Sequence, residues 1–160
     1  MSFFKNLKCV DLTSKLIILL SILGLLPFAF GLIDLLINKD NLFFLINIPK
    51  YYGAIILTFL GAVYWGIVIK DSVQNYLSEK LKAYIVCWSI FPSILAILNL
   101  ILKDNSSIIV LATCFIFVQI VDEFIIKYLR LPIWYLRLRR ILTIFVVIIL
   151  IFSYFLVIDD

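Results

Sequence analysis

The sequence contains no histidine. This absence excludes haem or zinc bound through histidine, Ser-His and Cys-His nucleophile pairs, and the usual pH switch. Cysteine is scarce as well: Cys9, Cys87 and Cys114 are far apart and form no C-x-x-C pair. The last two lie inside apolar runs, where a thiol behaves as a small hydrophobic group. We therefore expect no disulfide framework, no metal site and no cofactor.

Charged residues are also few. Only 15% of the 160 residues are charged and 65% are hydrophobic, whereas a soluble domain has about a quarter charged residues. The mean hydropathy is +1.19. No contiguous soluble surface remains to carry a basic patch, which argues against nucleic-acid binding. The composition indicates an integral membrane protein whose first partner is the lipid bilayer.

Several apolar runs are present, and each has about the 18–20 residues that a transmembrane helix needs. They cover about 16–37, 51–69, 83–102, 107–126 and 141–158. Helices are expected because the alternation typical of barrel strands is absent. The sequence predicts an all-α fold in which residues 1–160 form one membrane domain, a polytopic transmembrane bundle of five helices. The segment 42–48 is too short to span, and we expect it at the outer interface.

Basic residues are distributed unevenly between the two sides of the membrane. Eleven Lys and Arg residues fall on the side of the N-terminus: Lys5, Lys8, Lys15, Lys70, Lys80, Lys82, Lys127, Arg130, Arg137, Arg139 and Arg140. Only Lys39, Lys50 and Lys103 fall on the other side. Since loops rich in Lys and Arg remain inside, the N-terminus is expected inside and the C-terminus outside.

The first apolar run has an alternative interpretation. Positive residues before it and the A-F-G at 29–31 are compatible with a cleaved signal peptide. However, apolar residues continue to Ile37, which is longer than the core of a usual signal peptide. The length favours a retained first helix.

The stretch L-P-I-W-Y-L-R-L-R-R-I-L at 131–142 precedes the fifth run. Trp and Tyr favour the headgroup layer, and Arg favours the inner face near anionic lipid. We expect an interface anchor, with a docking surface for a partner as the alternative. Its residues are Trp134, Tyr135, Arg137, Arg139 and Arg140.

Polar residues inside a bilayer are costly and therefore informative. In the fourth run Gln119, Asp122 and Glu123 are spaced i, i+3 and i+4, which places them on one helix face. Lys127 follows Glu123 at ion-pair spacing. One hypothesis is an ion-pair network that locks the fourth helix to the fifth. The alternative is a proton relay or cation site, which is weakened because no acid lies at the centre of another span.

Small and aromatic residues gather in the second and third runs. Gly61, Ala62 and Gly66 allow close helix packing, and Pro92 should kink its helix. The alternative to simple packing is a cleft for a lipophilic ligand. The candidate cleft residues are Tyr64, Trp65, Trp88 and Pro92.

Four pieces together carry a family resemblance: Y-G-A-I-I-L-T-F-L-G-A-V-Y-W-G (52–66), W-S-I-F-P-S-I-L-A (88–96), the acidic end of the fourth run with Asp122, and L-P-I-W-Y-L-R-L-R-R-I-L-T (131–143). The chain resembles an uncharacterised family of five-span bacterial membrane proteins that includes mitochondrial transmembrane protein sixty-nine. Members often carry His where this chain has Tyr64, and Glu123 is an extra acid. The resemblance implies the cytoplasmic or mitochondrial inner membrane, and no activity.

Three functions remain open. The leading one is a non-catalytic scaffold or assembly partner of a membrane complex, with another membrane protein or a second copy as partner. The second is a binding module or carrier for a small lipophile, a quinone or a lipid. The third and weakest is ion-coupled transport. We expect no enzyme, because the chain has no histidine, no paired carboxylates at mid-depth and no nucleophile motif.

Overall fold

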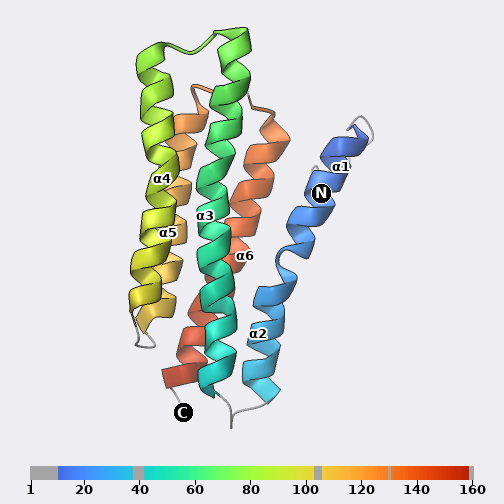
Figure 1. The fold of residues 1–160 in the computed structure, drawn as a ribbon. Helices are drawn as coiled ribbons and strands as arrows, with labels where there is room; N and C mark the ends of the chain where they lie inside the picture. Colours follow the sequence, from blue (N-terminus) through green and yellow to red (C-terminus); the bar gives the residue numbers. More distant parts are fainter. Residues whose placement is uncertain (1–10, 38–41, 103–105, 130, 159–160) are drawn as a thin grey trace.

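The computed structural model describes residues 11–37, 42–102, 106–129 and 131–158, and these contain helices and no strand (Figure 1). The helices are α1 (Leu12–Leu23), α2 (Leu26–Ile37), α3 (Leu42–Gln74), α4 (Glu79–Ile101), α5 (Ser106–Ile126) and α6 (Ile133–Ile158). In the described part five segments are long and apolar enough to span a membrane, because α1 and α2 together form the first. The predicted all-α bundle of five spans is confirmed. Outside the described residues lie Lys5, Lys8, Cys9, Lys39, Lys103 and Arg130.

The first span is interrupted between α1 and α2. Pro27 lies in the first turn of α2 and has no N–H to donate to the carbonyl of Leu23. The backbone hydrogen bonds of the helix are therefore interrupted at this point. The carbonyl of Gly24 instead accepts a hydrogen bond from the hydroxyl of Tyr52 in α3, at 3.0 Å. A neighbouring helix thus supplies a hydrogen-bond donor to one of the carbonyl groups at the break.

Helix α3 begins earlier than the apolar run suggested. Residues 42–48, expected as a short interfacial segment, form its first turns, and Pro49 lies within the helix. Lys50 was counted as a loop residue, yet it is buried, and its ammonium group donates to the carbonyl of Leu102 at the end of α4. A cation suits this position because the last carbonyls of a helix carry partial negative charge.

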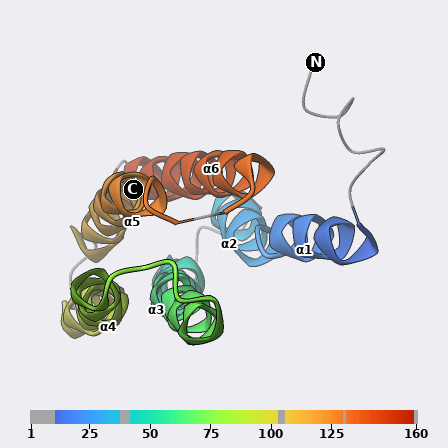
Figure 2. The same ribbon diagram turned by 90° about the horizontal axis from the view of Figure 1, so that it is seen from above.

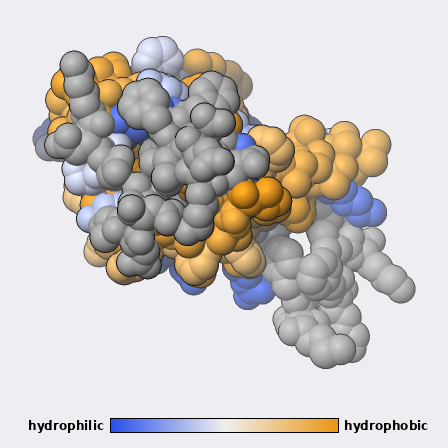
Figure 3. Space-filling model, turned by 90° about the horizontal axis from the view of Figure 1, so that it is seen from below, coloured by the Kyte–Doolittle hydropathy of each residue, from blue (hydrophilic) through white to orange (hydrophobic). Residues whose placement is uncertain are grey.

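Helix α3 packs mainly on α4, and α5 mainly on α6 (Figure 2). The largest buried cluster lies between α2, α3, α5 and α6 and includes Phe28, Leu57, Leu111, Phe115 and Leu150. Seen from the end that carries the C-terminus, the parts of the sides that are visible around the rim of the molecule are mostly apolar (Figure 3). These sides match the hydrocarbon that surrounds a multi-pass membrane protein.

Helix α1 stands apart from the rest of the bundle (Figures 1 and 2). Ile18 is the single buried residue of α1, all of which the structure describes. Helix α2, in contrast, buries Phe28, Gly31 and Leu35. The first span is therefore held to the bundle by its second half.

The α3–α4 and α5–α6 connections lie at one end of the molecule, which we call the basic end (Figure 1). The basic end is defined by its exposed cations, which are Lys70, Lys80, Lys127 and Arg137. It is the end that is expected, from the charge bias of the sequence, on the inside of the membrane.

A buried acid organises the α3–α4 turn at the basic end. Asp71 is fully buried, and its carboxylate accepts hydrogen bonds from the backbone N–H groups of Tyr76 and Leu77, at 3.1 and 3.3 Å. Lys82 lies 3.3 Å from the same carboxylate. The turn also contains Asn75 in the left-handed region, with φ of 50°. Asp71 thus provides an acceptor for two amides of the turn between α3 and α4.

We predict that Asp71→Ala lowers the midpoint of thermal unfolding by several degrees. The substitution leaves two backbone N–H groups without an acceptor and removes the buried one of the two carboxylates that contact Lys82. Glu79→Gln is the matched control, because Glu79 also contacts Lys82 but its side chain is 85% exposed. Circular dichroism of the purified protein in detergent measures both variants. Equal midpoints for the two would show that Asp71 has no such role.

Candidate functional site

One carboxylate connects four helices. Asp122 of α5 is fully buried. Its Oδ1 accepts a hydrogen bond from the hydroxyl of Tyr64 in α3 at 2.5 Å, and another from the indole N–H of Trp88 in α4 at 3.3 Å. Its Oδ2 pairs with the guanidinium of Arg139 in α6. Asp122 is therefore the point at which α3, α4, α5 and α6 are joined by polar contacts.

The cation of this cluster is buried too. Arg139 is 5% exposed, and its Nη1 also donates to the hydroxyl of Tyr135 at 3.3 Å. The guanidinium carbon lies 5.9 Å from the centroid of the Tyr64 ring, within cation–π range. The Nε has no hydrogen-bond partner among the described residues. Burying an ion pair is favourable only when further contacts offset desolvation, and here Tyr64, Trp88 and Tyr135 supply them.

A second, more exposed set of contacts runs beside the first. Glu123 accepts from Arg140 at 2.8 Å and from the side-chain amide of Gln119 at 3.2 Å. Thr143 donates to the other end of Gln119 at 3.1 Å. Lys127, which the spacing placed beside Glu123, has its ammonium group 5.0 Å from the centroid of the Phe124 ring. Exposed pairs of this type contribute about 1 kcal/mol or less.

The expected polar site and the expected anchor are thus joined. Gln119, Asp122 and Glu123 lie on the α5 face that meets α6, opposite Arg139 and Arg140. We expected Arg139 at the membrane surface with the other arginines, but the structure buries it because Asp122 lies within reach. The remaining anchor residues keep partly or fully accessible positions: Trp134 and Tyr135 are half-buried, and Arg137 and Arg140 are exposed.

The four candidate cleft residues do not line one cleft. Tyr64 is buried and bound to Asp122. Trp65 is 52% exposed, and its indole N–H donates to the hydroxyl of Ser89. Pro92 is buried in the contact between α3 and α4. Neighbouring residues of one helix point in different directions, which separates Tyr64 from Trp65.

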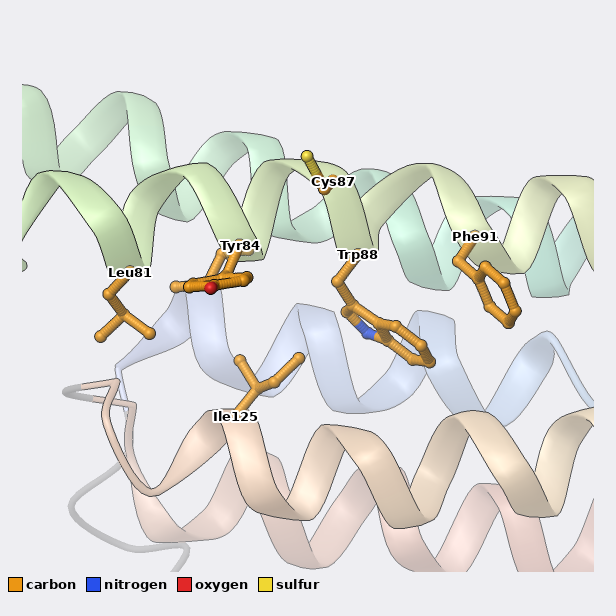
Figure 4. Close-up of a pocket in the computed structure, with 7 residues that line it drawn as sticks. Leu81, Tyr84, Cys87, Trp88, Phe91 and Ile125 are labelled. Carbon is orange, nitrogen blue, oxygen red and sulfur yellow. The ribbon is translucent and has the colours of Figure 1, made fainter.

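A different groove lies between α4 and α5, and Trp88 is the only candidate cleft residue that lines it (Figure 4). We call it the α4–α5 groove. It has a volume of about 400 Å³ and is open to the surroundings. Its lining residues are Leu81, Tyr84, Ile85, Cys87, Trp88, Phe91 and Ile125. The helical spacing of the aromatic residues in α4 could have indicated this face, but not its partner helix.

The chemistry available in the site is limited. Within the described residues no group of three or more His, Cys, Asp or Glu side chains could hold a metal ion. The carboxylates of Asp122 and Glu123 are both engaged with arginine. Cys114 is half-buried in α5 and Cys87 is exposed on α4. The polar cluster therefore has the geometry of an interhelical connection.

Comparison with known proteins identifies the family. Residues 13–155, nearly the whole chain, match the family described as protein of unknown function (DUF3429). No curated protein and no solved structure matches the chain. The match spans all five membrane-compatible segments and both halves of the polar cluster. The chain is therefore a member of the DUF3429 family.

Proposed function

We propose that this protein is a non-catalytic membrane scaffold that assembles with another membrane protein through α1. The observation that carries the proposal is the position of α1, which stands off from the bundle and buries a single residue of its own. Its large apolar side chains are open to contact with a second helix: Leu16, Leu19, Leu20 and Leu23 are each 46–65% exposed. Helices in membranes associate through such packing contacts.

The interior of the bundle supports a structural role over a chemical one. The buried charges Asp122 and Arg139 are paired with each other, and Asp122 accepts further hydrogen bonds from α3 and α4. A transport site needs a carboxylate that can exchange its proton or cation with a pathway. Asp122 has 0% exposure and contacts side chains from three other helices, which favours an ion-pair connection between helices over ion-coupled transport.

We place the protein in the cytoplasmic or inner membrane with its basic end inside. The excess of Lys and Arg at this end supports the orientation. The resemblance to a family with a mitochondrial member supports an inner membrane as the location. In this orientation the exposed cations of the basic end face the side where anionic lipids and partner domains are found.

The test is affinity purification in mild detergent, with bulky substitutions on α1. The double variant Leu16→Trp/Leu20→Trp changes one face of α1, because the two positions are one turn apart. Ile97→Trp/Ile101→Trp on α4 is the matched control, with side chains 60% and 67% exposed. We expect a stoichiometric protein partner with the native chain and the control, and at least a tenfold lower yield with the α1 variant.

Other results would contradict the proposal. The proposed role of α1 would be contradicted if the chain were recovered without a stoichiometric protein partner. It would also be contradicted if both double variants lowered the yield of the partner equally. If the partner were a second copy of the chain, α1 would mediate homo-oligomerisation and not assembly with another membrane protein. A proton-coupled flux in vesicles that Asp122→Asn abolishes, with the protein still folded, would favour transport.

A further inference from the structure

The α4–α5 groove has the length of one lipid leaflet. Its α4 wall runs from Leu81 near the basic end to Phe91, ten residues further along the helix. At about 1.5 Å per residue this is about 15 Å. Half of the hydrocarbon core of a bilayer has the same thickness, about 15 Å. The groove therefore extends from the membrane surface to the middle of the bilayer.

The lining of the groove suits a hydrocarbon chain and offers little to a polar molecule. Trp88 and Phe91 are stacked, with ring centroids 5.4 Å apart, and Ile125 faces them from α5 (Figure 4). The indole N–H of Trp88 donates to Asp122. A quinone would bring two carbonyl groups, whereas Tyr84 offers one hydroxyl at the headgroup end of the lining, and a carbonyl left unpaired deeper in an apolar groove is costly. An acyl chain has no such requirement.

The end of the groove carries a positive charge. Lys80 is exposed and precedes Tyr84 by four residues and Cys87 by seven, so it lies on the same face of α4 as these two lining residues. Tyr84 is 74% exposed, as expected for an aromatic side chain at the headgroup layer. At the end of α5, on the other side of the groove, Lys127 is also exposed.

We propose that the α4–α5 groove is a binding site for one anionic phospholipid of the inner leaflet. One acyl chain lies along Trp88, Phe91 and Ile125, and the phosphate pairs with Lys80. The groove length, the mostly apolar lining and the cation near its end are each matched by this ligand. The site is independent of the scaffold proposal, because it uses α4 and α5 and not α1.

The experiment uses Trp88 as its reporter. The chain has three tryptophans, so Trp65→Phe/Trp134→Phe leaves Trp88 alone. This variant is reconstituted in phosphatidylcholine vesicles with increasing fractions of brominated phosphatidylglycerol, or of brominated phosphatidylcholine with the same chains. Bromine quenches a tryptophan that it contacts. We expect half-maximal quenching at an about fivefold lower fraction of the anionic lipid, the preference that one Lys near a membrane surface provides.

Substitutions of Lys80 test whether the preference for the anionic lipid arises at this groove. Lys80→Gln should make the two lipids quench equally, and Lys80→Arg should retain the preference. Lys15→Gln, an exposed lysine on α1 away from the groove, is the control and should change nothing. Equal quenching by both lipids in the parent protein would overturn the proposal. So would a preference that survives in Lys80→Gln, or native mass spectrometry that finds a bound quinone.

Discussion

Asp122→Ala is expected to lower the free energy of unfolding by about 3–5 kcal/mol, the usual cost of removing one partner of a buried ion pair. The substitution leaves Arg139, 5% exposed, without its counter-charge inside the bundle. It also removes the acceptor for the Tyr64 hydroxyl and the Trp88 indole. Reversible unfolding of the purified protein in mixed micelles, followed by circular dichroism, measures the loss.

Two further variants separate this effect from general damage. Glu123→Gln removes the neighbouring, largely exposed ion pair with Arg140 and should cost about 1 kcal/mol or less. Asp122→Leu/Arg139→Met replaces both buried charges by apolar groups and should recover the part of the stability that the unpaired Arg139 costs, while the Tyr64 hydroxyl and the Trp88 indole still lack their acceptor. A loss in Asp122→Ala no larger than that in Glu123→Gln would contradict the proposal that the Asp122–Arg139 ion pair holds α5 to α6.

The sequence predicted the α5 face of this cluster and offered an ion-pair network with the next helix as a hypothesis, but it placed Arg139 at the membrane surface. The i, i+3, i+4 spacing of Gln119, Asp122 and Glu123 defines one helix face. The arginines that begin the fifth span are close in sequence, separated from this face by a short connection. Both Asp122–Arg139 and Glu123–Arg140 join residues 17 positions apart. Contacts between consecutive antiparallel helices are accessible to such reasoning.

The rest of the cluster depends on distant parts of the chain. Tyr64 and Trp88 reach Asp122 from 58 and 34 residues away, on α3 and α4. The sequence showed both as aromatic residues inside apolar runs, which fits a cleft as well as a polar contact. Which face of α3 meets α5 is decided by tertiary packing, and helical spacing within α3 alone does not determine it.

The helix boundaries show where hydropathy is a poor guide. Apolar runs located all five spans, since the bilayer selects for them. Residues 42–48 were expected as an interfacial segment because they are too few to span, and Lys50 was counted with the same connection. Both form part of the first turns of α3, with Pro49 between them. The structure tolerates Pro49 and Lys50, because Lys50 binds the C-terminal carbonyl of α4 and the Pro49 ring packs near Gly31.

Two glycines of α3 lead to the second prediction. Gly61 and Gly66 look equivalent in the stretch G-A-V-Y-W-G. A Cβ at Gly61 would lie 2.2 Å from the backbone oxygen of Ser89 in α4. A Cβ at Gly66 would have no atom within 4 Å outside its own helical surroundings. Gly61 therefore faces the contact with α4, and Gly66 faces away from the bundle.

Gly61→Ala should destabilise the protein by about 3 kcal/mol, the upper part of the usual range for overpacking, because the opposing atom belongs to backbone that cannot rotate away. Gly66→Ala should leave stability unchanged or raise it by about 0.5–1 kcal/mol, since alanine is the better helix former. The same unfolding measurement serves for both variants. Similar effects of the two would mean that α3 and α4 are not held at the close approach that Gly61 permits. In that case the hydrogen bond from the indole N–H of Trp65 to the hydroxyl of Ser89 should be absent too, because it also joins α3 to α4.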